Sequence, residues 1–527
     1  MKRILIINLR RFGDVFYSGQ LIGGLLEKYP DAEISYLTYK ESARAARVFS
    51  QVKNIFTINR EKLGILLKGG PFSLAHALKE LKHCLRDVGF EWDLIVNVSN
   101  CAVSAQLTSY LSYNKENYKG VRYNTNGVLE FSDDWIAWAN EQMVDLSLTP
   151  YSYMEIFQKS LGLTPGSQRS VGLVRSEEHE VSTRKVFSRL HEFRATEQIY
   201  VVALQLSAAT SEKSATFEES KQLIQAIFDH PNLYPLLLVG PSEDERARAK
   251  ALNAVLENSL FVVDSDFIGL NSVLNSVDML LTVDTSIKHL ASLQNTKLLE
   301  LYFNPNLLFK MPSNSGSQIV LVDRAKVDGD FQSCMHFLTD CCSNILLNKT
   351  SAQPAPLGIS LFEYNLERGF TLIKTSSPEI REMHAYYGYH RACVAFALEQ
   401  KLDALLCSVS KELLAEYREI LSNILTAYRE ISQNTETSAN KIFSAINKLE
   451  PANYGMSPFK TLLAVRKAQI LPKFSNNIEM NRDLFKEFLL KTKDEFSELK
   501  RQIIFTHGSA KAANRSRSTL RPGEYEI

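Results

Sequence analysis

Four stretches of the sequence combine residue types that could bind a ligand at the end of a strand, and each follows an apolar run. The first is Leu9–Asp14, in which Gly13 permits a tight turn and Asp14 supplies a carboxylate. The second is Ser207–Ser214, whose small hydroxyl residues let backbone N–H groups approach a phosphate and whose Lys213 adds positive charge. The second stretch could therefore bind a ligand that carries a phosphate.

The other two stretches could hold the rest of such a substrate. Glu243 follows a strongly apolar run and could accept hydrogen bonds from a ribose or a sugar. Asp284, Thr285 and Ser286 come between an apolar strand and a helix, and His289 lies one turn into that helix. The N–H groups at a helix start, together with the positive end of its dipole, form an anion site.

Each stretch also has a plain structural interpretation that the sequence leaves open. Asp14 could simply cap a helix, and Lys213 could be a solvated lysine in a serine-rich connection. Charged neighbours make a solvated helix start the better interpretation of Glu243. A lone aspartate or histidine is usually structural, but Asp284 and His289 share their loop with two hydroxyl side chains, which brings the functional interpretation level with the structural one.

Few residues of the sequence have the spacing expected of metal ligands. The cysteines are scattered and form no CxxC pair, so buried free thiols are the better interpretation, even for the group at 334–342. Asp264 and Asp266 have the spacing of a metal-binding carboxylate pair and are the fallback metal site.

Composition narrows the class of protein. A chain of 527 residues predicts about three domains, and 45% hydrophobic with 23% charged residues is typical of a globular protein. The 60 basic residues against 59 acidic ones exclude a dedicated nucleic-acid binder. No apolar run is long enough to span a membrane, and the one after Arg3 is too short for a signal peptide, so we expect a cytoplasmic chain.

The apolar pattern predicts an α/β fold in which the four stretches lie at strand ends. Short apolar runs alternate with amphipathic stretches in two successive sets, which predicts two Rossmann-like domains at 1–170 and 171–350, with a hinge at 164–170. A helical module at 351–508 follows, dominated by one apolar stripe at 402–431, and 509–527 is expected to be a flexible tail. Ligands of such sheets bind beyond the carboxyl ends of the strands.

The same stretches, in this order, resemble glycosyltransferase family 9, the heptosyltransferase family. The resemblance covers residues 1–345 approximately and rests on a set of segments: MKRILIINLRRFGDVFYSGQLIGGLLEKYPDAEISYLT, EWDLIVNVSN, KGVRY, LQLSAATSEKSATFEE, LLLVGPSEDER and SVDMLLTVDTSIKHLASLQNTKLLELY. It implies a GT-B fold, with the acceptor on the first domain, the donor on the second and transfer with inversion from a nucleotide diphosphate sugar, commonly an ADP-heptose. No resident cofactor or metal is implied.

The resemblance also implies roles for individual residues. Asp14 matches the general-base aspartate, and Lys213 falls at the lysine that binds the donor phosphates. The remaining donor-binding positions are Ser207, Glu243, Asp284, Thr285, Ser286 and His289. Arg10 and Arg11 are assigned to the acceptor.

Two hypotheses of different class follow. The first is an inverting, metal-independent glycosyltransferase that moves a heptose or related sugar to a glycan, a lipopolysaccharide core or a protein. The second is a noncatalytic scaffold that presents the helical module to a protein partner, because the chain departs from the family pattern at Leu206–Ser207, Ser214–Ala215 and Ser286. A dinucleotide-dependent oxidoreductase is disfavoured by the absence of GxGxxG. Peripheral contact with the inner membrane is left open.

Overall fold

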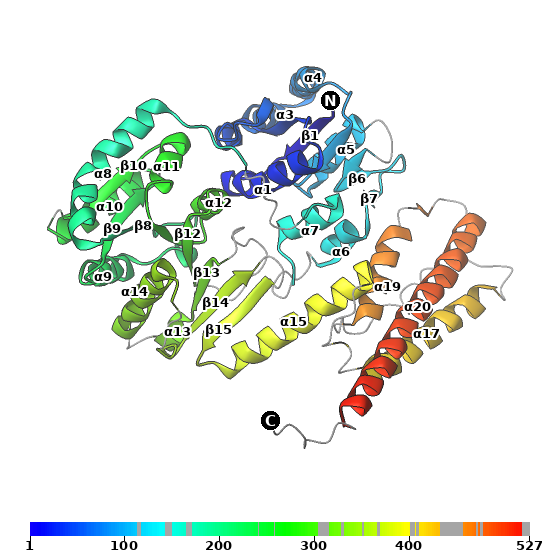
Figure 1. The fold of residues 1–527 in the computed structure, drawn as a ribbon. Helices are drawn as coiled ribbons and strands as arrows, with labels where there is room; N and C mark the ends of the chain where they lie inside the picture. The colour runs from blue at the N-terminus through cyan, green and yellow to red at the C-terminus, as the bar shows by residue number, and fades with distance from the viewer. Residues whose placement is uncertain are drawn as a thin grey trace. The chain divides into compact units, whose positions relative to one another are not determined.

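The computed structural model describes most of the chain, in two compact units that are each discontinuous in sequence. The described residues are 1–112, 117–142, 150–164, 171–240, 242–257, 259–303, 316–327, 331–349, 353–365, 369–400, 406, 410–432, 457–470, 473–474 and 478–518. The first unit comprises Met1–Arg122 and Leu146–His384, and the second comprises Tyr123–Asp145 and Ala385–Ile527 (Figure 1).

The first unit begins with a five-stranded parallel sheet in the order β3-β2-β1-β4-β5. Its strands are β1 (Arg3–Asn8), β2 (Glu33–Tyr39), β3 (Val52–Ile58), β4 (Leu94–Asn97) and β5 (Tyr118–Lys119). β1 is central because its sequence RILIIN is almost wholly apolar, as a strand covered on both faces requires. The hairpin strands β6 (Val121–Tyr123) and β7 (Leu129–Phe131) form a separate two-stranded sheet; β6 ends at the first residue of the second unit, and β7 belongs to that unit.

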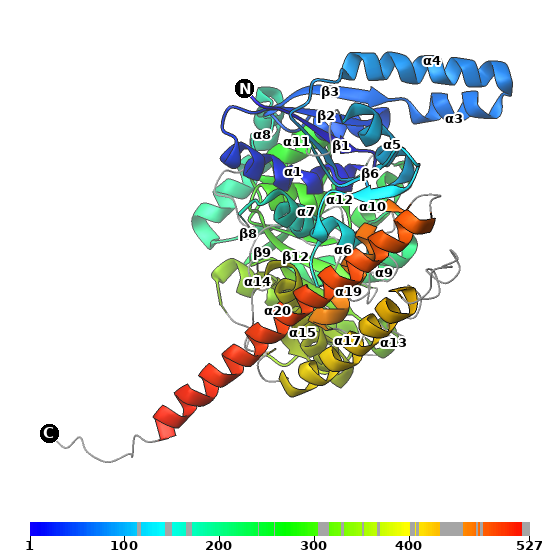
Figure 2. The same ribbon diagram turned by 90° about the vertical axis from the view of Figure 1, so that its right-hand side faces the viewer.

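Helices connect and cover these strands. They are α1 (Phe12–Lys28), η1 (Lys40–Ser42), α2 (Ala43–Ala46), α3 (Arg60–Lys68), α4 (Pro71–Val88), α5 (Ala102–Leu111) and α7 (Tyr153–Leu161). Figure 2 shows α3 and α4 side by side beyond β3, joined across their surface by the ion pair of Lys62 and Glu80, whose charged atoms are 2.6 Å apart. α1 is buried along most of its length, because small and apolar residues occupy nearly every position from Val15 to Leu26.

The second sheet of this unit has eight strands in the order β10-β9-β8-β11-β12-β13-β14-β15. The first six are parallel and the last two are antiparallel. The strands are β8 (Tyr200–Gln205), β9 (Leu233–Val239), β10 (Phe261–Asp264), β11 (Met279–Val283), β12 (Lys297–Tyr302), β13 (Gln318–Val322), β14 (Ile359–Asn365) and β15 (Gly369–Thr375). The helices are α8 (Glu177–Glu197), η3 (Ser211–Lys213), α9 (Phe217–Phe228), α10 (Glu243–Val255), α11 (Phe267–Leu274), α12 (Ser286–Leu293), α13 (Arg324–Val327) and α14 (Phe331–Leu347).

The end of this sheet differs from the expected domain boundary. The hairpin β14–β15 lies within the predicted helical module but pairs with β13, so that it extends the second sheet. Apolar residues of β14 such as Leu361 and Phe362 are buried there. The helical part therefore begins after β15 rather than at residue 351. Most of the expected hinge, at 165–170, lies outside the described residues.

The second unit is helical, as predicted. Its helices are α6 (Asp134–Gln142), α17 (Ser410–Ser432), α19 (Pro458–Ile470) and α20 (Ile478–Ser518), and α15 (Pro378–Glu399) enters it from the first unit. Buried aromatic rings form its core, including Phe396, Phe459 and Phe496. The predicted stripe is seen in α17, while 401–405 and 407–409 lie outside the described residues.

The carboxyl-terminal helix is longer than the sequence predicted, and no described helix is suited to crossing a membrane. α20 continues to Ser518, into the segment predicted as a flexible tail, and 519–527 lie outside the described residues. Among the helices that the structure describes, none is both long and apolar enough to cross a bilayer.

Candidate active site

The loop after β1 places Asp14 in the first turn of α1. The loop is held by Ser99, whose hydroxyl accepts a hydrogen bond from the backbone N–H of Leu9 at 2.6 Å and whose carbonyl accepts one from Arg10 Nε at 2.7 Å. Arg11 is the residue before the helix and makes no side-chain cap. Asp14 is thus the third helical residue, which removes the interpretation of this aspartate as a simple helix cap.

The surroundings of Asp14 are polar and partly buried. Its backbone carbonyl accepts a hydrogen bond from Asn8 Nδ2 at 3.0 Å, and its side chain is half-buried. Tyr153 donates its hydroxyl to Val98 O at 2.9 Å, and its ring lies 6.0 Å from the Arg10 guanidinium. Burial raises the pKa of Tyr153, Arg10 lowers it and the Asp14 carboxylate raises it further. Arg10, Asp14 and Tyr153 therefore lie in one electrostatic neighbourhood.

The start of α1 lies directly against the start of α12. A Cβ atom on Gly13 would lie 3.2 Å from Ser286 Cα and 3.3 Å from Ser286 Cβ. One turn further along α1, the Tyr17 ring packs on the His289 ring with the centroids 4.4 Å apart. The absent side chain of Gly13 thus lets two helix starts meet, and it brings the loop of Asp14 beside Ser286 and His289.

The start of α12 has the features of an anion site. Thr285 precedes the helix, and its side chain makes no hydrogen bond to the first-turn N–H groups. The Thr285 hydroxyl lies 3.2 Å from the hydroxyl of Thr282 instead. The N–H groups at Ser286 and Ile287 thus begin a helix without a side-chain cap, where the helix dipole favours negative charge.

The loop after β8 supplies a lysine to this site. β8 lies next to β11 in the sheet, so the loops that follow these two strands share one edge. Lys213 Nζ lies 2.5 Å from Asp284 Oδ2 across that edge. The structure therefore brings together Lys213 and Asp284, which are far apart in sequence and were both predicted as donor-binding residues.

A buried ion-pair cluster lies behind Asp284. Lys288 Nζ is 2.8 Å from Asp284 Oδ1, contacts the Glu300 carboxylate and donates a hydrogen bond to the Tyr302 hydroxyl at 2.9 Å. Lys288 and Glu300 are both fully buried. We call Lys213, Asp284, Lys288, Glu300 and Tyr302 the donor-loop cluster.

The cluster shifts the ionisation of its members. Burial by itself would raise the pKa of Asp284, but Lys288 and Lys213 hold it well below its usual range. Burial would likewise lower the pKa of Lys288, yet Asp284 and Glu300 raise it well above the usual value. Burial raises the pKa of Glu300 to about 8 in spite of Lys288. Asp284 and Lys288 both keep their charges as a result, and they form a buried ion pair.

Sequence reasoning missed Lys288, Glu300 and Tyr302. Lys288 follows Asp284 by four residues and lies on the buried side of a short helix, and Glu300 interrupts the apolar strand KLLELY. A lysine and a glutamate at positions that should be apolar are the signal that could have found the pair, because buried charges are almost always paired.

The loop between β8 and α9 is held by residues outside the prediction. Ser214 Oγ accepts a hydrogen bond from Ala208 N at 2.8 Å and donates one to Thr210 O at 2.9 Å. Arg324 Nη2 donates to Ser214 O at 2.7 Å and pairs with Glu219 at 2.7 Å. These contacts fix the backbone that carries Lys213.

Three predicted residues have no comparable setting. Ser207 is half-buried, and its carbonyl accepts a hydrogen bond from Gln205 Nε2 at 3.1 Å. Glu243 is exposed at the first position of α10, which Ser242 caps. Arg11 is also exposed. Glu243 and Arg11 keep the plain interpretation of solvated charges as well as the functional one.

The fallback metal site has other partners. Asp264 Oδ2 lies 2.6 Å from Arg246 Nε. Asp266 Oδ1 caps α11 by accepting a hydrogen bond from Gly269 N at 2.8 Å, and it lies 3.5 Å from His179 Nε2. Over the residues that the structure describes, no group of three or more histidine, cysteine, aspartate or glutamate side chains is arranged to hold a metal ion.

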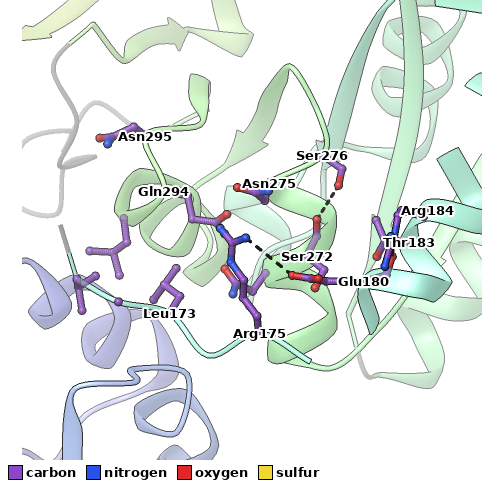
Figure 3. A pocket seen from close by; sticks show the side chains of 14 residues that line it. Leu173, Arg175, Glu180, Thr183, Arg184, Ser272, Asn275, Ser276, Gln294 and Asn295 are labelled. Atoms are coloured by element: carbon purple, nitrogen blue, oxygen red, sulfur yellow. Dashed lines mark hydrogen bonds and ion pairs between the residues drawn. The ribbon is translucent and has the colours of Figure 1, made fainter. Parts of the chain in front are cut away.

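A pocket of about 630 Å³ lies elsewhere in the first unit (Figure 3). It is lined at the end of α12 by Leu293 and Gln294, and on α8 by Glu180, which pairs with Arg175 at 3.9 Å. With a rise of 1.5 Å per residue, the end of α12 is about 10 Å from its start. None of the predicted site residues lines this pocket.

Comparisons with known proteins agree with the predicted family. The model of glycosyltransferase family 9 (heptosyltransferase) matches residues 79–333. This range includes Lys213, Asp284 and His289 but not Asp14, which precedes it. No curated protein matches the chain.

Several solved structures are similar to the chain at low sequence identity. A glycosyl transferase family 9 protein of Veillonella parvula is 15% identical, covers 66% of this chain and 98% of its own, and has a TM-score of 0.47. E. coli heptosyltransferase WaaC with ADP-2-deoxy-2-fluoro heptose is 18% identical over 57% of this chain and 88% of its own, with a TM-score of 0.41. E. coli ADP-heptose LPS heptosyltransferase II is 15% identical over 66% of this chain and 99% of its own, with a TM-score of 0.43.

Because these TM-scores are below 0.5, the assignment rests on the family model. The two sheets, with strand ends that carry the predicted loops, are the fold expected of that family. We therefore assign residues 79–333 to glycosyltransferase family 9, and the chain to the glycosyltransferases.

Proposed function

We propose that the chain transfers a heptose or a related sugar from a nucleotide diphosphate, with inversion and without a metal, to a glycan or protein acceptor. The observation that carries the proposal is the close approach of Gly13 to Ser286, where a Cβ atom added to Gly13 would lie 3.2 Å from Ser286 Cα. It sets a carboxylate at the start of α1 beside an uncapped helix start that suits a diphosphate. The match to a heptosyltransferase family supports the sugar class.

Asp14 acts as the general base in this proposal. The acceptor hydroxyl attacks the anomeric carbon from the face opposite the diphosphate, and the new C–O bond forms as the bond to the phosphate oxygen breaks. The proton of the hydroxyl passes to the Asp14 carboxylate, which is the role that a carboxylate within hydrogen-bond reach can fill. Arg10, fixed by Ser99 and close to Asp14, faces the acceptor side.

The departing diphosphate gains negative charge as the bond breaks. Lys213 and the N–H groups at the start of α12 stabilise that charge, as preorganised donors do in other transferases. Stabilisation by these groups makes a metal unnecessary for the charge of the leaving group.

The experiment has two parts. Thermal shifts with ADP, UDP and GDP identify the nucleotide, and mass spectrometry of products with ADP-heptose and candidate acceptors detects transfer. Asp14→Asn should keep the nucleotide shift and lose transfer by at least about 100-fold, the usual contribution of a general base. Asp31→Asn, an exposed aspartate of the same domain, is the matched control and should keep both.

The outcomes separate this proposal from the scaffold hypothesis. Full transfer by Asp14→Asn would show that another group is the base. A wild-type protein whose melting temperature responds to no nucleotide would favour a noncatalytic scaffold that uses the helical unit for a protein partner.

A further inference from the structure

Asp284 binds two lysines of contrasting character. Its Oδ2 lies 2.5 Å from Lys213 Nζ, and its Oδ1 lies 2.8 Å from Lys288 Nζ. The side chain of Lys213 is 46% exposed, whereas that of Lys288 is 0% exposed. One carboxylate therefore has one cation that solvent and a ligand can reach and one that they cannot.

Lys288 is fixed in place by a full set of partners. An ammonium group has three hydrogen-bond donors, and Lys288 Nζ meets three acceptors: Asp284, Glu300 and the Tyr302 hydroxyl. Moving Lys288 away would leave buried polar groups without partners, which is strongly unfavourable. Lys213 is held by one carboxylate on the surface, so moving it costs far less free energy than moving Lys288.

We propose that Lys288 is a positioning residue, a permanent buried counter-ion of Asp284 that releases Lys213 to bind the diphosphate of the donor. This inference rests on the proposed function. When a diphosphate arrives, Lys213 exchanges Asp284 for a phosphate oxygen, and Asp284 keeps the Lys288 ion pair. Without Lys288, the same exchange would leave a carboxylate that is only 20% exposed with no cation, so Lys213 would stay on Asp284.

The charges of the donor-loop cluster also favour the exchange of Lys213 from Asp284 to a phosphate oxygen. Asp284 and Lys288 form a buried ion pair, and burial raises the pKa of Glu300, which opposes a second negative charge beside Lys288. The charge of Lys213 is then the one that remains for a ligand. A Lys213–Asp284 pair without Lys288 would instead be neutral as a whole.

The test uses the full-length protein and two readouts that do not depend on transfer. Calorimetry measures ADP binding, with UDP and GDP in parallel, and acetylation by an N-hydroxysuccinimide ester followed by peptide mass spectrometry measures how available Lys213 is. Lys288→Met should weaken ADP binding by about tenfold or more, because a buried charge would be stranded. It should also slow acetylation of Lys213, which is then the sole cation of Asp284.

A second substitution tests the cause. In the double variant Asp284→Asn with Lys288→Met, Lys213 has no carboxylate to hold it, so acetylation of Lys213 should return to within about threefold of the wild-type rate. The matched control is Lys297→Met on the same strand as Glu300. Lys297 donates to Ile345 O at 2.9 Å and Leu346 O at 3.0 Å, so its loss should lower stability and leave both readouts unchanged.

Each result decides the inference. A folded Lys288→Met protein with wild-type ADP affinity and acetylation, or a double variant without recovery, overturns it. If wild type binds none of the three nucleotides, the proposed function fails, and the acetylation rates still decide whether Lys288 controls Lys213. If Lys288→Met does not fold, Lys288→Gln replaces it in the test, because glutamine keeps a hydrogen-bond donor for Asp284 without the charge. This variant should likewise weaken ADP binding and slow the acetylation of Lys213.

Discussion

Replacing Gly13 by alanine should force apart the two helix starts that form the candidate site. The added Cβ would lie 3.2 Å from Ser286 Cα, closer than the 3.4–4 Å of ordinary van der Waals contact. The atom in the way belongs to the backbone of α12, which is buried against α1 and β12, so no flexible side chain can turn aside. Overpacking of this kind costs about 1–3 kcal/mol.

We expect Gly13→Ala to lower the free energy of unfolding by about 1–2 kcal/mol and to weaken both nucleotide binding and transfer. Urea denaturation gives the first quantity, and calorimetry with ADP and product analysis give the others. The control is Gly64→Ala in α3, where no atom lies within 4 Å of the added Cβ. Because alanine is the better helix former, this variant should gain about 0.5–1 kcal/mol and keep full activity.

A Gly13→Ala protein as stable and as active as wild type would refute the reasoning. It would show that the starts of α1 and α12 are not held in contact, and that the position of Asp14 beside Ser286 does not matter for function.

Three further predictions concern the ionic contacts. The raised pKa of Glu300, about 8, means that its proton stabilises the fold fully below pH 4.5 and that this contribution is lost as pH rises through 8. The free energy of unfolding should thus fall by up to roughly 1.4 kcal/mol per pH unit between these values, and the slope should flatten in Glu300→Gln. Arg324→Met should lose about 1–3 kcal/mol in urea denaturation and weaken ADP binding, since it frees the loop that carries Lys213. Arg466→Met should lose about 3–5 kcal/mol, because Arg466 is only 15% exposed and would leave two carboxylates of the helical unit without their cation; a melting temperature equal to that of wild type would contradict this.

The strands β1–β4 and β8–β12 could be predicted from the sequence to within a few residues, whereas β5 and β13 were missed. The runs RILIIN and MLLTV are mostly apolar, as strands covered on both faces must be, and turn residues flank them. The hairpin of β14 and β15 was missed because ISLFEYN and GFTLIKT mix polar and apolar residues. Only pairing with β13, a tertiary event, shows where they belong.

The candidate site also contains residues that the sequence predicted and residues that it did not. The loops that carry Asp14, Lys213 and Asp284 were predictable, because the carboxyl ends of parallel strands define where ligands bind. The buried partners Lys288 and Glu300 were missed, because a charged residue at an apolar position shows that a partner is needed but does not show which residue that partner is. Their contact joins α12 to β12, and no local pattern specifies that register.

The helical unit includes the described segment 123–142, which lies far ahead of its other helices in sequence. In α6, Trp135 and Trp138 are buried, and Asp134 binds Arg466. During synthesis this segment leaves the ribosome more than two hundred residues before its partners on α19. Its tryptophan side chains are therefore without those partners while the two sheets of the first unit are synthesised. Removing the carboxyl-terminal helices would leave the same surface uncovered for good, and such a truncated protein should aggregate or be held by chaperones.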